Sequence, residues 1–270
     1  MNYDAMAFND TTVGKIVMDK MNTRSDTKSN SYADAEERLR DHLENSVIPR
    51  SEILENLHLF ITPQQLRRIL FLYEIYKDIL TVPGVIMQFG VRWGRELALF
   101  ESLRTTFEPF NHSRKVIGFD TFSGYQGIDK KDGNHSVIVE GNLTTSAKYE
   151  DILDDLLSTR EQMDPLPHIQ KYDLIKGNAE ETLEKYLIDN PHTIISLAHL
   201  DMNLYKPTKA CLELLKPHMP RGSIIIIDEV NLDIMPGETL AIKEVFGLEN
   251  IKLKRHPSVN PTWPAYFVVE

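Results

Sequence analysis

Three carboxylates follow two apolar runs of the sequence, and their types and spacing suggest chemistry. Asp201 ends the run Thr193–Leu200, and Asp228 and Glu229 end the run Gly222–Ile227. Each run reads as a buried parallel strand, and open α/β sheets bind ligands at the carboxyl ends of such strands. Crowded carboxylates repel one another unless a cation or a shared proton relieves them, and oxygen ligands suit Mg²⁺ or Ca²⁺. The spacing therefore predicts a divalent-metal site; the alternative is that these acids only cap the following helices.

The turn from Phe89 to Gly94 is a second candidate site, because it leads from a predicted strand into a helix. Gly90 and Gly94 let the backbone pass close to a ligand, and the helix start offers unpaired N–H groups to a phosphate or carboxylate. The glycine spacing differs from that of dinucleotide-binding folds, and no Lys-Ser/Thr pair follows as in a phosphate-binding loop. The turn predicts a nucleotide-cofactor site of another kind, with an ordinary tight turn as the alternative.

Two further turns could complete a nucleoside site. Asp120 closes the next predicted strand within Gly118–Gly124, where an acid can accept hydrogen bonds from both hydroxyls of a ribose. The alternative for Asp120 is the N-cap of a helix. Gly177-Asn178-Ala179 follows a later strand, where an amide could bind an adenine edge, although Gly-Asn is also a common turn.

Alternating strands and helices from about Pro83 onward would place these residues at one sheet edge. Parallel strands of right-handed βαβ units are predicted at residues 85–89, 115–119, 172–176, 193–200 and 222–227. Residues 251–255 and 265–269 are joined by too few residues for a helical crossover, so we expect an antiparallel hairpin. The predicted fold class is α/β: a Rossmann-like seven-stranded sheet, mostly parallel, with helices on both faces and an N-terminal helical extension.

Three regions are predicted along the chain. Residues 1–32 are expected to form a flexible arm, because residues 20–31 are polar and turn-rich. Residues 33–82 form a helical extension, in which Thr62, Pro63 and Gln65 signal the start of a long amphipathic helix. Its predicted apolar face comprises Leu66, Ile69, Tyr73, Tyr76 and Leu80. This face would pack on the main domain or on a second subunit, so a homo-oligomer is expected.

Residues 83–270 form the predicted main domain, and residues 121–171 within it are too long for an ordinary connection. Such an excess is typical of a functional cover, so we predict a lid-like insertion with its own helix near Tyr149–Gln162.

Composition narrows the expected partners. Forty acidic against 30 basic residues give a formal charge of -10, so neither nucleic acid nor an anionic membrane is an expected partner. No apolar stretch approaches the ~20 residues of a membrane helix, so a cytoplasmic enzyme acting on small molecules is expected. The single cysteine, Cys211, lies at helical spacing among apolar residues, and it is predicted to be a core residue.

Taken in order, these segments resemble class I S-adenosylmethionine-dependent methyltransferases from about Pro83 to the C-terminus, and most of all the macrocin and mycinamicin sugar O-methyltransferase family. The segments that carry the resemblance are Phe89–Gly94, Gly118–Gly124, Lys176–Asn178, Leu200–Thr208 and Gly222–Glu229. The resemblance implies that S-adenosyl-L-methionine is bound by Gln88, Phe89, Gly90, Arg92, Gly94, Asp120, Thr121, Phe122, Gly177, Asn178 and Ala179. It also implies Mg²⁺, or a similar divalent cation, held by Asp201, Asp228 and Glu229.

Three residues depart from the family's pattern. Gln88 stands where the family usually has glutamate, and Glu229 replaces the second aspartate of an Asp-Asp pair. Asn203 occupies the position of the family's proposed general base, and asparagine cannot accept a proton. Deprotonation of a substrate hydroxyl would then fall to Asp201, to a nearby histidine such as His199, or to water after a metal acidifies the hydroxyl.

The predicted reaction is in-line transfer of the sulfonium methyl group to a hydroxyl of a small molecule, with a divalent ion that orients and acidifies it. The resemblance implies a sugar acceptor, on a nucleotide-sugar or a glycosylated natural product, and a catechol-like diol stays open. His135 and Tyr205 are the candidate substrate contacts; the alternatives are an idle loop histidine and a tyrosine packed on the sheet edge. Alternative functions are a metal-independent N- or O-methyltransferase and a non-catalytic binding or assembly subunit with this fold. A nicotinamide oxidoreductase is disfavoured by the glycine spacing.

Overall fold

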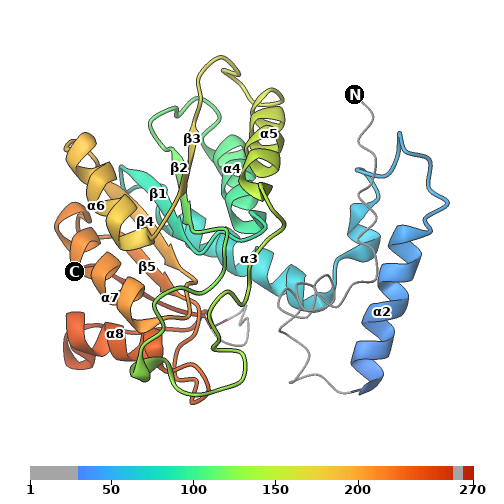
Figure 1. The fold of residues 1–270 in the computed structure, drawn as a ribbon. Coiled ribbons are helices and arrows are strands. Elements are labelled where there is room, and N and C mark those ends of the chain that lie inside the picture. Colours follow the sequence, from blue (N-terminus) through green and yellow to red (C-terminus); the bar gives the residue numbers. More distant parts are fainter. Residues whose placement is uncertain (1–29, 258–263) are drawn as a thin grey trace.

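The apolar runs of the sequence form one sheet at the centre of the molecule. The structure is a computed structural model that describes residues 30–257 and 264–270 (Figure 1). Its six strands have the order β3-β2-β1-β4-β5-β6. The parallel strands are β1 (Val85–Phe89), β2 (Val116–Asp120), β3 (Tyr172–Lys176), β4 (Ile195–Leu200) and β5 (Ile224–Ile227), and β6 (Ala265–Val268) is antiparallel to β5. The strand order reverses between β1 and β4, which is where open α/β sheets bind ligands.

The prediction of seven strands is wrong by one. Within residues 251–255 a single bridge forms, in which Lys254 and Tyr266 exchange backbone hydrogen bonds of 2.8 and 2.9 Å. Strand β6 pairs along its length with β5, from Ile224 opposite Val268 to Ile227 opposite Ala265. The sequence Ile-Lys-Leu-Lys-Arg places charged side chains along this segment, and charge at a sheet edge disfavours further pairing.

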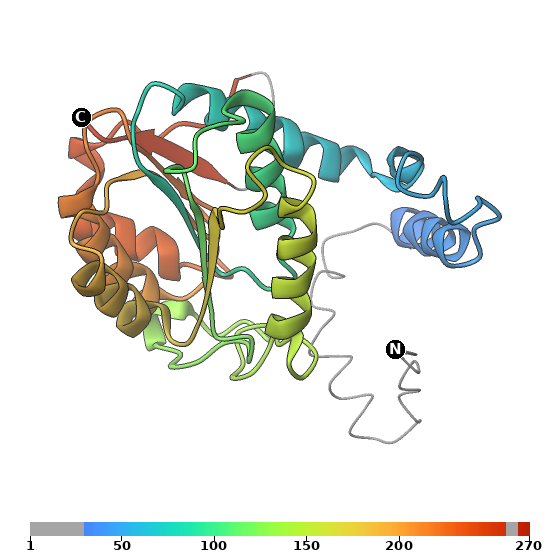
Figure 2. The ribbon, with the colours of Figure 1, turned by 90° about the horizontal axis from the view of Figure 1, so that it is seen from above.

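Helices cover both faces of the sheet, as predicted. Figures 1 and 2 show α3 (Pro63–Asp78), α4 (Arg95–Phe107) and α5 (Tyr149–Glu161) on one face. The other face carries α6 (Ala179–Asp189), α7 (Tyr205–Leu215) and α8 (Gly237–Val245). Successive strand residues point to opposite faces of the sheet. Ile86 therefore packs in the core under α3, α4 and α5, and Met87 packs in the core under α6, α7 and α8.

Helix α3 begins where the sequence predicts, and its buried side chains match the predicted apolar face in part: Tyr76 is buried, and Tyr73 and Leu80 pack against the core. Thr62 and Gln65 form a capping box, with N–H···O distances of 3.3 and 2.9 Å. The side chains that α3 buries are Phe71, Leu72, Ile75 and Tyr76. Leu66, which was predicted to be on the apolar face, is 47% exposed. The helix therefore packs through its second half, and its first turns extend beyond the core.

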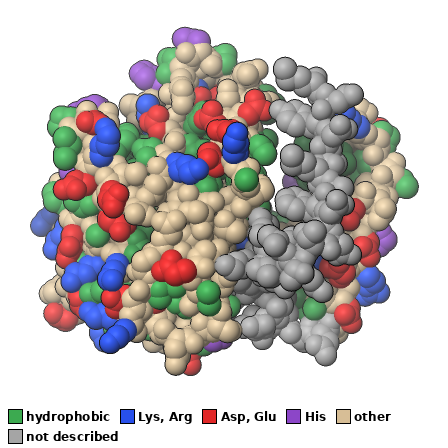
Figure 3. Space-filling model, viewed as in Figure 1, with side chains coloured by type: hydrophobic (Ala, Val, Ile, Leu, Met, Phe, Trp, Pro, Cys, Tyr) green, Lys and Arg blue, Asp and Glu red, His purple; other side chains and the backbone are tan. Residues whose placement is uncertain are grey.

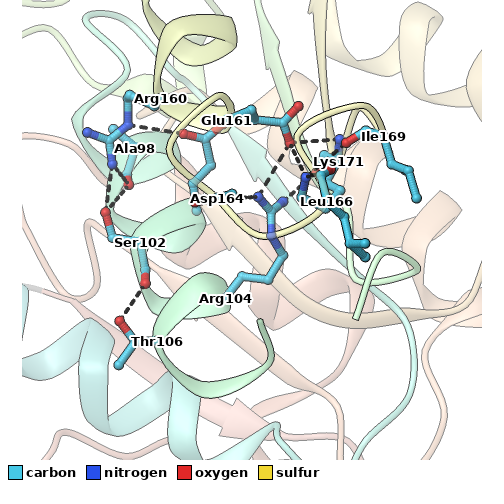
Figure 4. A network of polar contacts seen from close by, with 11 residues as sticks. Ala98, Ser102, Arg104, Thr106, Arg160, Glu161, Asp164, Leu166, Ile169 and Lys171 are labelled. Atoms are coloured by element: carbon cyan, nitrogen blue, oxygen red, sulfur yellow. Dashed lines mark hydrogen bonds and ion pairs between the residues drawn. The ribbon is translucent and has the colours of Figure 1, made fainter. Parts of the chain in front are cut away.

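Buried ion pairs fix the end of the 121–171 segment to the helical layer (Figure 4). Arg104 of α4 donates to the carbonyl oxygen of Lys171 at 2.8 Å and to the carboxylate of Asp164 at 2.9 Å. Glu161 accepts from the backbone N–H of Lys171 at 2.8 Å. Buried charges that are paired and hydrogen-bonded in this way hold one geometry, so this end of the segment is fixed.

The N-terminal region stands apart from the sheet. Helix α2 (Asn30–Glu44) and the short 3-10 helix η1 (Leu57–Phe60) precede α3 and lie to one side of the body in both views (Figures 1 and 2). The predicted arm, residues 1–32, lies almost entirely outside the described residues. Within the described part of the chain, no helix has the length and apolarity to cross a membrane.

On the face that Figure 3 shows, Lys and Arg side chains are interspersed with Asp and Glu rather than gathered into one basic surface.

Candidate active site

A cavity of about 450 Å³ opens at the carboxyl ends of β1 to β4, the edge that the sequence predicts to carry the site. Seven of the predicted cofactor-binding residues line it: Gly90, Arg92, Asp120, Thr121, Gly177, Asn178 and Ala179. Four residues predicted to act on the metal or the substrate line it too: Asp201, Asn203, Glu229 and His135. The structure thus brings the glycine turn, the ribose candidate and the acidic residues to one space.

The other four predicted cofactor residues do not line the cavity. Gln88 and Phe89 are fully buried in the sheet, and Phe122 is 6% exposed within a core. Gly94 is the N-cap of α4, where an added Cβ would meet Leu153 at 2.4 Å. The Gln88 amide lies 3.4 Å from the carbonyl oxygen of Gly90, and its own oxygen has no hydrogen-bond partner within the described residues. These four residues therefore pack beneath the turns that border the cavity and do not face it.

Gly90 is required by the close approach of two strand ends. Its φ is +85°, and an added Cβ would stand 1.9 Å from the carbonyl oxygen of Asp201. The backbone N–H of Gly90 donates to Phe119, and that of Asp201 donates to Phe89, at 3.0 and 2.9 Å. A side chain at this position would push β1 away from β4. The glycine therefore lets Asp201 lie directly beside the turn.

Asp120 shapes the two turns that border the cavity. Its carboxylate accepts from the backbone N–H of Arg92 at 2.7 Å and of Phe122 at 2.6 Å. Arg92 and Phe122 both have positive φ, 49° and 54°, so these bonds stabilise strained turns. Burial raises the pKa of Asp120, and the N–H groups that it accepts from oppose that shift. Asp120 has a structural role beside the predicted ribose contact.

His199, Asp201 and Asp228 offer ligand atoms that all lie within 4.8 Å of one another. His199 and Asp228 are buried, whereas Asp201 is partly exposed to the cavity. Two carboxylates and one imidazole are a donor set that divalent cations accept, since carboxylates suit Mg²⁺ and Mn²⁺ and imidazole suits later transition metals. These residues therefore fit a divalent ion.

Glu229, the third predicted metal ligand, lies outside this group. With the Asn203 amide oriented so that donors face acceptors, its nitrogen lies 2.9 and 3.2 Å from the two carboxylate oxygens of Glu229. The amide oxygen of Asn203 accepts from the hydroxyl of Tyr125 at 3.2 Å. Burial, and then the charges of Asp228 and Asp201, raise the pKa of Glu229 well above its usual range. Asn203, at the position of the family's proposed general base, thus links Glu229 to Tyr125. Metal binding by Glu229 stays a prediction.

Solved structures of known function identify the family. CalS11, described as a calicheamicin methyltransferase, is 38% identical over 89% of this chain and 93% of its own, with a TM-score of 0.87. A structure of apo CalS11, described as a TDP-rhamnose 3'-O-methyltransferase, is 37% identical over 89% of this chain and 95% of its own, with a TM-score of 0.79. The chain belongs to the S-adenosylmethionine-dependent sugar O-methyltransferases. The family prediction and the assignment as an enzyme are confirmed.

A more distant structure shares the methyltransferase fold. The O-methyltransferase NovP is 17% identical over 75% of this chain and 79% of its own, with a TM-score of 0.56. No protein-family model and no curated protein matches the chain.

In this methyltransferase a buried glutamate holds both acidic strand ends in place. One oxygen of Glu238, in α8, accepts from the backbone N–H groups of Met202 and Asn203, each at 2.9 Å. Its other oxygen accepts from the N–H of Glu229 at 3.1 Å. Burial raises the pKa of Glu238 to about 7, and the three N–H groups oppose that shift. Glu238 thereby sets where Asp201 and Glu229 stand relative to each other.

The methyltransferase also places a cation among the acids. Arg68 of α3 donates to Asp228 through Nη1, and its Nε lies 3.3 Å from Glu96. Its Nη2 lies 3.6 Å from Asp201 and 3.2 Å from Nε2 of His199. Burial would lower the pKa of Arg68, but the three carboxylates outweigh it and hold that pKa above its ordinary value. Arg68 and His199 likewise outweigh burial at Asp228, and they lower the pKa of its carboxyl.

Three of the residues predicted to act on the metal or the substrate do not line the cavity of the methyltransferase: His199, Asp228 and Tyr205. His199 is fully buried beneath it, next to Asp228. The hydroxyl of Tyr205 accepts from Nζ of Lys131 at 2.9 Å and donates to Glu244 at 2.6 Å. The backbone N–H of Tyr205 donates to Asp132. Tyr205 therefore packs at the sheet edge, and its placement does not support the predicted substrate contact. The side chains that sequence reasoning missed here are Arg68, Glu96, Tyr125 and Glu238.

Proposed function

We propose that this enzyme transfers the methyl group of S-adenosylmethionine to a hydroxyl of a sugar carried on a nucleotide or on a glycosylated natural product. The observation that supports this most is that Asp120 and Asp201 line one cavity. In this proposal the turns around Asp120 bind the nucleoside of the cofactor, and Asp201 contacts the acceptor. CalS11, with 38% identity, is described as acting on TDP-rhamnose, which supports a nucleotide-sugar as the acceptor.

Asp201 is the proposed proton acceptor. Transfer forms a carbon–oxygen bond, breaks the carbon–sulfur bond and leaves S-adenosylhomocysteine, so the hydroxyl must lose its proton. Asn203 cannot take this proton, and His199 is fully buried. The side chain of Asp201 is 15% exposed and borders the cavity, so its carboxylate can reach a bound hydroxyl. His199, Asp201 and Asp228 would hold the divalent ion, Mg²⁺ or a similar one, which when bound would lower the pKa of a sugar hydroxyl.

A metal-independent mechanism is the second candidate, and Arg68 is the observation that favours it. Its guanidinium already supplies a positive charge to Asp201, Asp228 and Glu96. In that case Arg68 would keep the carboxylates in place, and Asp201 would act as a base without an ion.

The division of the chain belongs to this proposal as well. We infer that residues 83–270 are the catalytic domain, that residues 121–171 cover the cavity, and that residues 33–82 contact a second copy. Val47, Leu54 and Leu59 are 97%, 75% and 64% exposed, which supports a contact in this extension. The homo-oligomer and a cytoplasmic location stay predictions.

The test is methyl transfer from radiolabelled S-adenosylmethionine to a panel of TDP-sugars, TDP-rhamnose first, with and without a chelator. We expect the wild-type enzyme to form methylated sugar, and Asp201→Asn to lose about 10²-fold or more of its turnover while it still binds S-adenosylhomocysteine. Asp189→Asn, in an exposed acid of α6, is the control and should keep full turnover. Binding of the cofactor without transfer to any TDP-sugar would overturn a TDP-sugar as the acceptor. Full turnover in excess chelator would select the metal-independent mechanism.

A further inference from the structure

We propose that Arg68 is a built-in competitor for the divalent cation, so that helix α3 of the N-terminal extension sets the metal affinity of the catalytic edge. This inference rests on the proposed metal site of His199, Asp201 and Asp228.

The guanidinium of Arg68 contacts the same side chains that an ion would need. It donates to Asp228, and it lies 3.6 Å from Asp201 and 3.2 Å from His199, the three members of the candidate metal group. Nε2 of His199 lies between the guanidinium, which has only donors, and Asp228 at 3.3 Å, so it either accepts from Arg68 or donates to Asp228. In either state this nitrogen has no lone pair free for a metal. Arg68 and an ion therefore cannot both make these contacts.

Arg68 cannot avoid this competition by losing its charge. The guanidinium stays protonated in proteins. The carboxylate of Glu96, in α4, lies 3.3 Å from Nε of Arg68, and the Glu96 side chain is 4% exposed. A second cation brought to Asp228 and Asp201 would meet a like charge a few ångströms away, in a site from which water is largely excluded.

The packing of α3 shows how the guanidinium could withdraw. Residues 63–67 of the helix are exposed, whereas Phe71, Leu72, Ile75 and Tyr76 are fully buried. The turn that carries Arg68 thus lies between the exposed first turn of α3 and the buried second half of the helix. Movement of this turn would remove Arg68 from Asp228 without disturbing the core, and contacts made by the extension would change the metal affinity.

The test is a titration with Mn²⁺, followed by the electron paramagnetic resonance signal of the free ion, in the presence of S-adenosylhomocysteine. We expect Arg68→Gln to bind Mn²⁺ about ten- to a thousandfold more tightly than the wild type, which is the range of shifts that one nearby charge causes. Arg67→Gln removes an exposed arginine of the same helix, and it should bind like the wild type. Adding Asp228→Asn to Arg68→Gln should abolish the gain.

Arg68→Gln leaves several carboxylates without their cation, so its fold is checked by its melting temperature with and without Mn²⁺. If Arg68 competes with the ion, Mn²⁺ should raise the melting temperature of Arg68→Gln more than that of the wild type. Arg68→Lys, which keeps a charge, should fall between the two in affinity. Equal or weaker Mn²⁺ binding by folded Arg68→Gln, or a gain that persists with Asp228→Asn, overturns the inference. Because this assay needs no sugar acceptor, failure of the proposed function would appear separately, as absent methyl transfer by the wild type.

Discussion

Replacing Glu101 with glutamine should make the enzyme more stable at alkaline pH but not at acidic pH. Glu101 lies in α4 and is 3% exposed; one of its oxygens accepts from Nε of Arg160 at 3.1 Å. The other oxygen has no hydrogen-bond partner within residues 30–257 and 264–270. Burial raises the pKa of Glu101 to about 7 from an ordinary value of 4.5, and Arg160 opposes the shift.

The sign of the effect follows from proton linkage. Between pH 4.5 and about 7 the folded protein holds a proton on Glu101 that the unfolded chain has released. Stability contributed by this group therefore falls as the pH rises through that window, and it is lowest above pH 7. At about 1.4 kcal/mol per pKa unit, a rise from 4.5 to about 7 corresponds to at most about 3.5 kcal/mol, and we expect about 2–3 kcal/mol of it to appear as lost stability. At about 2–4 °C per kcal/mol for a chain of this size, the melting temperature of Glu101→Gln should exceed the wild-type value by about 4–12 °C at pH 8.

The assay is calorimetric unfolding of both proteins at pH 5, 6, 7 and 8. At pH 5 the two melting temperatures should lie close together, and the gap should widen up to about pH 7 and stay level to pH 8. Glu184→Gln, in an exposed position of α6, serves as the control and should track the wild type at every pH. Methyl transfer should be unchanged, because Glu101 does not line the catalytic cavity. Parallel curves for Glu101→Gln and the wild type would refute the reasoning.

Three other substitutions test the geometry of the site. Glu238→Gln places an amide nitrogen against one of three backbone N–H groups, so turnover should fall about tenfold or more while S-adenosylhomocysteine binding stays within about twofold; unchanged turnover would contradict the positioning role. Gly90→Ala brings a Cβ to 1.9 Å from the Asp201 carbonyl oxygen, so calorimetry should show a loss of about 3 kcal/mol or more, and wild-type stability would show that β1 and β4 separate easily. Thr62→Ala removes the capping box of α3 and should cost about 1 kcal/mol in urea unfolding, whereas no loss would mean that packing alone fixes that helix end.

The sequence predicted the sheet and the edge that carries the site because both follow from local patterns. Apolar runs closed by an acid identified β2, β4 and β5, and parallel strands necessarily bring their carboxyl ends together. This is why Asp120 and Asp201 were expected at one edge before their partners were known. The glycine turn was also recognisable from a local pattern, two glycines between a strand and a helix. Gly90 and Gly94 both have positive φ in the structure.

The partners of these residues could not be predicted, because they come from distant parts of the chain. Arg68 and Asp228 are 160 residues apart, and nothing in an amphipathic helix shows which of two adjacent arginines turns inward. Tyr125 lies in a long connection without periodicity. Glu238 carried a weak signal, since it is an acid in the first turn of a helix after Pro236-Gly237, a place where acids commonly accept from backbone N–H groups.

Crystals of the enzyme grown with S-adenosylhomocysteine and Mn²⁺, measured at the manganese absorption edge, test the central claim most directly. The account predicts one anomalous peak about 2.0–2.6 Å from oxygens of both Asp201 and Asp228, with the ribose of the nucleoside at Asp120 and Arg68 withdrawn from Asp228. A nucleoside bound far from Asp120, or manganese bound elsewhere while Arg68 keeps its contacts with Asp228, would contradict it.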